Sequence, residues 1–260
     1  MWYFESQFDA NHISIAESGF SGIATRASRS SRLRVEAQFF LGLCYLRQKK
    51  ISDAKDQFKE VLKQLNKIKS NQTRQLFQKR IIERIEQESV LTTIIGVDEG
   101  PMKPECIYQE AEKLAQKSKE EIVELLARAL PYGSVQLLNN VRNEVILQLR
   151  DVDRKLLLAP EQASQPVQVG SMVLSVLKRV GWKTFCSSDS PLYKLWSQKI
   201  PKVFNRTYFA TAIVQSFNKW KIGVPFLAAG VVAIAMKYSA EEFCDLTKPD
   251  SIMETRRKRT

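Results

Sequence analysis

The sequence contains few of the residues on which several enzyme classes depend. Among its 260 residues there is a single histidine, His12, and neither a glycine-rich phosphate loop nor a Gly-x-Ser-x-Gly nucleophile motif occurs. Acidic residues do cluster, as at Glu120, Glu121 and Glu124, but on a helix such a run is a solvated face and not an acid–base pair. We therefore predict a protein that is not an enzyme and has no catalytic residue, cofactor or metal site.

Glycine and proline are also scarce. The 10 glycines and 9 prolines make up about 7% of the chain, where about 12% is usual. That is too few turn-forming residues for a β-sandwich, a β-barrel or a disulfide-rich scaffold. Because 44% of the residues are apolar and 26% are charged, the chain can still bury a sizeable core. The composition therefore predicts an all-α protein.

The four cysteines give no sign of pairing. Cys44, Cys106, Cys186 and Cys244 are far apart in the sequence and form no Cys-x-x-Cys motif, and His12 is the only imidazole that could complete a zinc site. The first residues lack the basic and apolar segments of a secretory signal. We therefore expect free thiols and a cytoplasmic protein.

The formal net charge of +12 is distributed unevenly along the chain. Residues 1–70 carry +5, residues 71–160 carry −1 and residues 161–260 carry +8. Basic ends of this kind can face a polyanion, either nucleic acid or an anionic lipid surface, although a basic balance also keeps a protein soluble. Charge alone leaves these alternatives open.

The most informative segment is 35–68, in which apolar residues recur at helical spacing on both sides of a polar break. This pattern predicts two helices joined by a turn. The small residues Gly42 and Ala54 would let the two helices cross closely, and Phe58 would fill the space beside the crossing.

This segment resembles a tetratricopeptide repeat. Six positions match the family pattern in register: Leu41, Gly42, Tyr45, Ala54, Phe58 and Val61. Gln38 and Asn66 depart from it, because the family usually has a bulky residue and a proline there. The resemblance implies a helical surface that binds a protein partner, and Tyr45 and Arg47 are the candidate partner-binding residues.

One repeat cannot bury its own faces, so it needs helical neighbours. Periodic apolar residues predict such helices over 12–28 and 72–95. Together these segments would form a TPR-like helical array over residues 1–95. The alternative is a generic helical hairpin that matches the repeat pattern by chance.

A long helical pair is predicted over residues 104–158. Its helices, 105–130 and 134–158, are separated by the sequence LPYGS. The second helix has an apolar stripe comprising Leu138, Val141, Val145, Leu149, Val152 and Leu156. Such a stripe serves either internal packing of a hairpin or self-association along a coiled-coil seam. Residues 159–170, which contain two prolines, are predicted to be a linker.

The last predicted module, residues 171–260, is basic and aromatic-rich and contains a strongly apolar helix at 222–236. A helix of this length extends about 22 Å, which is shorter than the roughly 30 Å hydrocarbon core of a bilayer. It is therefore either the buried centre of a soluble domain or a marginal membrane segment. In the second case, basic and aromatic residues would mark the boundary with lipid or another polyanion: Trp220, Lys221, Lys237, Arg256 and Arg257.

A further interpretation assigns nucleic-acid binding to the basic stretch 178–221. Its nine basic residues would neutralise phosphates, and its aromatic residues would stack on bases. No recognised nucleic-acid-binding motif accompanies them.

The interpretation we adopt is an all-α scaffold or adaptor: a TPR-like array that binds a protein, a long helical pair, and a C-terminal helical module that docks on a membrane or on its own core. A membrane-perturbing effector is the other alternative.

Overall fold

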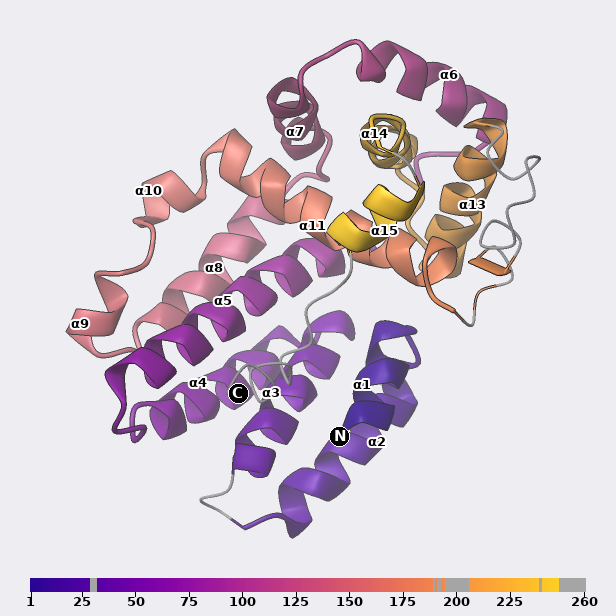
Figure 1. Ribbon diagram of the computed structural model, residues 1–260. Coiled ribbons are helices and arrows are strands. Elements are labelled where there is room, and N and C mark those ends of the chain that lie inside the picture. Colours follow the sequence, from indigo (N-terminus) through magenta and orange to yellow (C-terminus); the bar gives the residue numbers. More distant parts are fainter. Residues whose placement is uncertain (29–31, 189, 191–192, 195–205, 239, 248–260) are drawn as a thin grey trace. The chain divides into compact units, whose positions relative to one another are not determined.

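A computed structural model shows an all-helical protein (Figure 1). The residues that it describes are 1–28, 32–188, 190, 193–194, 206–238 and 240–247. These residues form 14 helices and no β-strand, apart from an isolated bridge between Asp98 and Gly223. The predicted all-α class is thus confirmed. The chain divides into two compact units, each of which combines two separate stretches of sequence.

The first unit comprises Met1–Thr92 and Gly133–Ser164. Its helices are α1 (Trp2–Asp9), α2 (Ile13–Arg26), α3 (Arg32–Arg47), α4 (Ile51–Leu65), α5 (Asn71–Ile94, which runs two residues into the second unit), α8 (Ser134–Ile146), α9 (Asp151–Arg154) and α10 (Pro160–Ala163). Helix α2 packs between α1 and α3, and α4 packs between α3 and α8. Helices α1 to α4 therefore lie against one another in sequence order, and α8, from a later part of the chain, packs on α4.

Helices α3 and α4 form the hairpin predicted for the segment 35–68. Ala54 and Phe58 are fully buried, and a Cβ atom added at Gly42 would lie 2.6 Å from the Phe58 ring. The crossing therefore requires the smallest residue at Gly42, which is the physical reason that the sequence pattern suggested. Lys49, with a φ of 62°, lies in the turn that joins the two helices.

Helix α5 carries charged side chains into the interior of the first unit. Arg74, Glu86 and Glu88 are at most 9% exposed. Each forms an ion pair with a different helix: Arg74 with Asp153 of α9, Glu86 with Arg142 of α8, and Glu88 with Arg47 of α3. Buried charges are tolerated when they are paired in this way, so polar contacts fix the position of α5 on several sides.

The helix predicted over 134–158 ends early. Helix α8 stops at Ile146, and the short helix α9 begins five residues later. Four residues of the predicted stripe are buried, namely Leu138, Val141, Val145 and Leu149. Val152 and Leu156 are instead 63% and 65% exposed. The first part of the stripe thus serves internal packing. The prediction of a coiled-coil seam along the whole stripe is wrong, because the helix that would carry it is broken after Ile146.

The second unit comprises Thr93–Tyr132 and Gln165–Thr260. Its described helices are α6 (Pro104–Ala115), α7 (Lys119–Arg128), α11 (Pro166–Phe185), α13 (Arg206–Lys219), α14 (Pro225–Ala235) and α15 (Ala240–Thr247). The single helix predicted over 105–130 is two helices, because Ser118 caps α7 in a capping box with Glu121. The predicted linker 159–170 is itself partly helical, since it contains α10 and the start of α11.

The two units also divide the chain differently from the domains predicted above. Helices α6 and α7 pack against the C-terminal helices α14 and α11, whereas α8, α9 and α10 belong to the first unit. The predicted helical pair 104–158 is therefore shared between the units instead of forming an extension of its own. Residues 93–132 are an insertion into the first unit's sequence that folds with the second unit.

Helix α14 is the buried centre of the second unit. It packs against α6, α7, α11 and α13, and every residue from Leu227 to Ala235 is buried. A Cβ atom at Gly230 would lie 2.5 Å from Leu126 of α7, so the small residue permits a close helix approach. None of the described helices combines the length and the apolar character needed to span a bilayer. Most of the predicted segment 222–236 thus lies in the interior of the second unit.

The expectation of four free thiols is wrong. Cys186, directly after α11, forms a disulfide with Cys244 of α15, while Cys44 and Cys106 are free. The bonded cysteines are 58 residues apart in sequence and lie in a cluster that includes Phe185 and other aromatic residues. Only the fold brings them together. The argument for a cytoplasmic location from unpaired cysteines therefore no longer holds.

Candidate partner interface

Helices α1 and α2 expose large apolar side chains in the first unit. Trp2 and Tyr3 of α1 are 59% and 61% exposed, and Ile15 of α2 is 48% exposed. A shallow open groove lies between the two helices and is lined by Phe4, Ser14, Ile15, Ser18 and Gly19. Exposed apolar and aromatic groups beside a groove are typical of protein-binding surfaces. We name this region, Trp2–Phe4 with Ser14–Gly19, the N-terminal surface.

Aromatic packing holds the floor of the N-terminal surface in place. The Phe4 ring packs so closely on α2 that a Cβ atom at Gly19 would lie 2.2 Å from it. Behind it, Phe20 stacks on Phe40 of α3 with ring centroids 4.8 Å apart, and Phe8 meets Phe40 edge to face at 6.0 Å. Such pairs stabilise by about 0.5–1.5 kcal/mol beyond the area that they bury. Helix α1 is thus anchored by one face, and Trp2 and Tyr3 remain outside.

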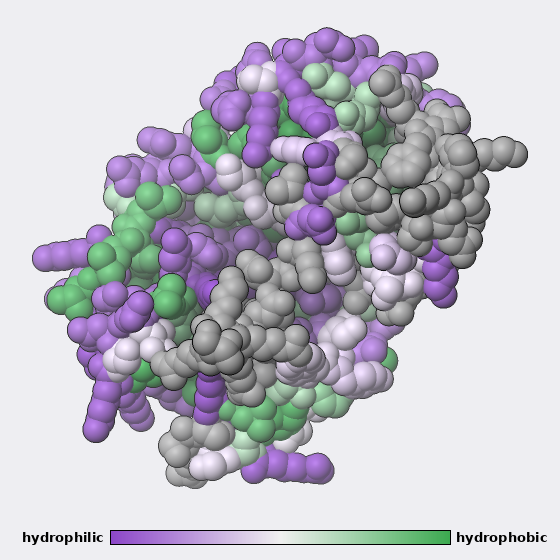
Figure 2. All heavy atoms as spheres, viewed as in Figure 1, coloured by the Kyte–Doolittle hydropathy of each residue, from purple (hydrophilic) through white to green (hydrophobic). Residues whose placement is uncertain are grey.

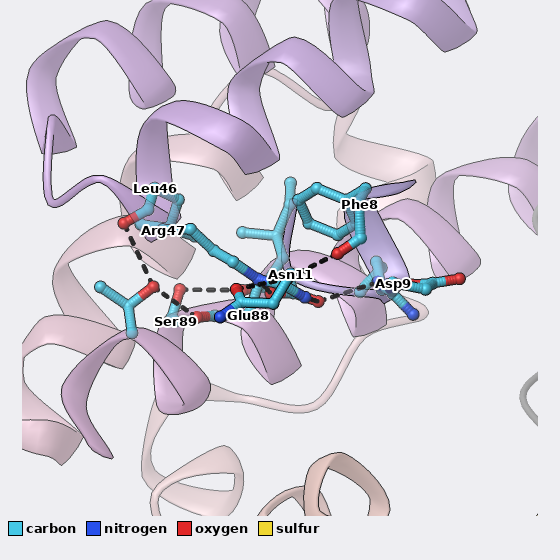
Figure 3. Close-up of polar contacts among 10 residues, drawn as sticks. Phe8, Asp9, Asn11, Leu46, Arg47, Glu88 and Ser89 are labelled. Atoms are coloured by element: carbon cyan, nitrogen blue, oxygen red, sulfur yellow. Dashed lines mark hydrogen bonds and ion pairs between the residues drawn. The ribbon is translucent and has the colours of Figure 1, made fainter. Parts of the chain in front are cut away.

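A buried polar cluster, which we call the arginine clamp, fixes the other end of α1 (Figure 3). The Arg47 guanidinium donates to both carboxylate oxygens of Glu88, at 2.9 and 3.2 Å. It also donates to the backbone oxygen of Phe8 at 2.8 Å and lies over the Phe8 ring, 3.9 Å from its centroid. One side chain of α3 therefore joins α1 to α5 through charge-assisted hydrogen bonds and a cation–π contact.

Arg84 of α5 completes the arginine clamp. It pairs with Asp9 at the end of α1 at 2.9 Å and with Glu88 at 3.2 Å. Asn11, which follows α1 with a φ of 65°, accepts a further hydrogen bond from Arg47 at 3.3 Å. The positive φ turns the chain from α1 into α2, a conformation that asparagine tolerates well.

A cysteine and the single histidine of the chain lie near the arginine clamp. Burial raises the pKa of the nearby Cys44 thiol to about 12, so this thiol stays protonated and is a poor nucleophile. The single histidine, His12, lies at the N-terminus of α2 and contacts the side-chain oxygen of Gln7 at 2.8 Å. Within the described ranges, no three His, Cys, Asp or Glu residues are grouped so that they could hold a metal ion.

The two residues predicted to bind a partner are placed differently. Tyr45 is partly exposed, and the Lys50 ammonium lies 5.6 Å from the centroid of its ring. Partial burial, followed by the carboxylates of Glu17 and Asp53, raises the pKa of Tyr45. Arg47 is only 6% exposed and belongs to the arginine clamp. Its prediction as a partner-binding residue is corrected: Arg47 positions α1, and its guanidinium is closed to a partner.

The residues predicted to mark a membrane boundary have protein contacts of their own. The Trp220 side chain is 3% exposed, so protein covers the indole that was expected at a lipid interface. Lys221 has a φ of 56° after the end of α13, and its backbone oxygen accepts a hydrogen bond from Gly96 at 2.7 Å. The Lys237 ammonium donates to the backbone oxygens of Ala115 and Lys117 at the end of α6. Arg256 and Arg257 lie outside the described residues.

In the basic stretch 178–221, the aromatic side chains that the structure describes are buried or pack against a buried cluster. Phe185 and Phe217 are at most 3% exposed, and Phe209 packs against the cluster around Phe185. Stacking on nucleic-acid bases requires aromatic faces that are open to solvent. Burial, with a smaller effect of Lys119, lowers the pKa of Lys178. Trp196, Lys199 and Lys202 of this stretch lie outside the described residues.

Sequence reasoning did not single out Trp2 and Tyr3. A signal for them exists, because Phe4 and Phe8 are four residues apart and would lie on one helical face. That face is the one that packs on α2 and α3, so a helix over 2–9 would place Trp2 on the opposite side.

No model of a known protein family, no curated protein and no solved structure shows significant similarity to this chain.

Proposed function

We propose that this chain is a non-enzymatic scaffold or adaptor that binds a protein partner through its N-terminal surface. The observation that carries the proposal is the exposure of Trp2, Tyr3 and Ile15 beside an open groove between α1 and α2. The arginine clamp joins α1 to α3 and α5. Tryptophan and tyrosine dominate the energetics of protein interfaces because they bury a large area with few rotatable bonds. A pre-positioned surface also loses less conformational entropy on binding.

The TPR-like segment contributes to this proposal as the support of the N-terminal surface. The α3–α4 hairpin carries Phe40 and Arg47, which contact α1 and α2. Tyr45 lies near Glu17 of α2, so a partner seated on α2 could extend towards it. We therefore retain Tyr45 as a candidate contact and assign the main contact to α1 and α2.

The proposal can be tested by replacing Tyr3 with a photo-crosslinking phenylalanine analogue in living cells. A matched control carries the analogue at Tyr132, which is fully exposed in the second unit. We expect a defined adduct from position 3 that position 132 does not give. The captured protein, once purified, should bind the wild-type chain and the Tyr132→Ala variant equally.

The Trp2→Ala/Tyr3→Ala variant should bind the captured protein at least about tenfold more weakly, because interface aromatics of this kind contribute about 2 kcal/mol or more when truncated. Equal binding by this variant and by wild type would refute the N-terminal surface as the docking site. Circular dichroism would verify that both variants keep their helix content, as expected for substitutions at exposed positions.

A further inference from the structure

A second apolar surface lies in the first unit, where α8 ends and α9 follows. Four aliphatic side chains within twelve residues are about half or more exposed: Leu147, Val152, Leu156 and Leu158. Figure 2 shows apolar side chains gathered over α9 and the segment that leads to α10. Soluble proteins seldom expose so many large aliphatic groups together without a use for them. We name these four residues the leucine surface.

Basic residues border the leucine surface. Arg150 and Lys155, which alternate with the leucines in sequence, are both exposed. The turn between α4 and α5 adds Lys67 and Lys69, also exposed. Exposed acidic residues are fewer than basic ones in this region. Asp151 is paired with Arg154, and Glu161 of α10 is the other exposed acid nearby.

Hydrogen bonds attach the basic turn to the base of α9. The Asn66 side chain donates to the backbone oxygen of Gln148 at 2.8 Å, and the Arg150 guanidinium donates back to the Asn66 carbonyl. Arg74 bridges the same two segments, since it donates to Ile68 and to Asp153 at 3.1 and 2.8 Å. The cations and the aliphatic residues are therefore held in one rigid end of the first unit.

We propose that this end of the first unit docks on an anionic lipid surface. The aliphatic side chains of the leucine surface enter the boundary between headgroups and acyl chains, while the four cations face the anionic headgroups. Composition distinguishes this surface from a protein-binding one. Protein hot spots are enriched in tryptophan, tyrosine and arginine and poor in leucine and valine, and this surface has the reverse bias. It is independent of the N-terminal surface, where Trp2 and Tyr3 fit a protein partner.

The first test measures binding of the full chain to phosphatidylcholine vesicles with and without phosphatidylserine, by co-sedimentation. Wild type should bind the anionic vesicles, and Leu156→Asp should bind about tenfold more weakly because several methylene groups no longer enter the bilayer. Leu33→Asp is the matched control, since it removes an exposed aliphatic side chain and adds the same charge on α3. Equal loss in both variants would overturn the proposal, because it would reflect net charge alone.

A charge test uses the same vesicles. Lys67→Glu/Lys69→Glu should weaken binding on the order of tenfold or more, since each cation near an anionic bilayer adds to the attraction. Lys79→Glu/Lys113→Glu makes the same change in net charge at exposed sites outside this end of the first unit and should have a smaller effect. Equal effects of the two double variants would contradict a localised docking site.

The second test asks whether the leucine surface enters lipid. A cysteine replacing Leu156, labelled with the environment-sensitive dye NBD in a Cys106→Ser background, should shift its emission to the blue on anionic vesicles. Cys44 is buried and the other two cysteines are disulfide-bonded, so the label is confined to the new site. The same label at position 33 should not shift. No shift at position 156, or self-association of the chain that Leu156→Asp abolishes in the absence of lipid, would assign the surface to another use and refute the proposal.

Discussion

Arg47 and Glu88 show how much a single buried ion pair contributes to this fold. Both side chains are at most 1% exposed, and they join α3 to α5. Truncation of one partner leaves the other charge buried and poorly compensated, which typically costs about 3–5 kcal/mol. We expect Arg47→Met to destabilise the first unit by about 3 kcal/mol, the lower end of that range, since Glu88 keeps its contact with Arg84.

Urea unfolding followed by circular dichroism measures this effect. The exposed Arg26→Met in α2 is the control and should change the free energy of unfolding by less than about 0.5 kcal/mol. A loss for Arg47→Met that is no larger than the control would show that the arginine clamp does not hold α1.

A second residue-scale prediction concerns pH. Hydrogen bonds from Arg74 hold the pKa of Asp153 below its ordinary value. Stability from such a carboxylate is fully present above the unfolded-state pKa of about 3.9 and is lost as the pH falls through the lower folded pKa. Asp153→Asn should therefore flatten the acid side of a plot of Tm against pH. An unchanged acid slope would mean that this ion pair does not contribute to acid unfolding.

Glu86 should act in the opposite direction. Burial raises its pKa despite the nearby Arg142, so folding makes this carboxyl easier to protonate than it is in the unfolded chain. Stability linked to this group is present below its unfolded-state pKa of about 4.3 and declines as the pH rises through the higher folded value. Glu86→Gln should remove that decline, which the same plot of Tm would show. A steeper decline of Tm with rising pH in this variant would contradict a raised pKa for Glu86.

At the scale of helices, the cap of α7 decides whether residues 105–130 form one helix or two. The Ser118 side chain accepts a hydrogen bond from the Glu121 backbone N–H, and the Ser118 backbone N–H donates to the Glu121 carboxylate. Loss of such a cap costs about 1 kcal/mol. Ser118→Ala should lower the stability of the second unit by that amount, and Ser118→Gly by only a few tenths of it. Equal effects of the two substitutions would argue against capping.

The disulfide determines how firmly α15 is held. It closes a loop of 58 residues, for which the chain-entropy model predicts a stabilisation of about 4 kcal/mol. Cys186→Ser/Cys244→Ser should lower the thermal stability of the second unit, and a reducing agent should do the same to wild type. Amide hydrogen exchange would locate the loss in α11 and α15. Unchanged protection in both helices would contradict a structural role for the bond.

At the scale of the whole molecule, the fold evens out the charge that the sequence distributes unevenly. Each unit contains 20 basic and 14 acidic residues, because the acidic insertion 93–132 folds with the basic C-terminal part. A concentrated footprint for nucleic acid is therefore weaker than the charge of residues 161–260 alone suggests. We expect no saturable binding of single-stranded DNA at 200 mM salt in a fluorescence-anisotropy titration. Saturable binding there would restore the nucleic-acid alternative.

The sequence predicted the helical class, the 35–68 hairpin and the apolar centre of the second unit, because each is encoded in local periodicity. It did not predict which distant helices pack together. Arg47 follows a helical apolar run and looks exposed, since its partner Glu88 is 41 residues away. Cys186 and Cys244 are similarly distant, and no spacing rule joins them. Trp2 and Tyr3 were missed because the short helix that carries them depends on contacts with α2 and α3.

The central claim is that a protein partner seats on α1 and α2. Hydrogen exchange of the chain with and without the partner captured through Tyr3 tests it most directly. We predict slower exchange in residues 2–19, with residues 104–128 of the second unit unchanged. Protection confined to the second unit, with 2–19 exchanging as in the free chain, would contradict the account.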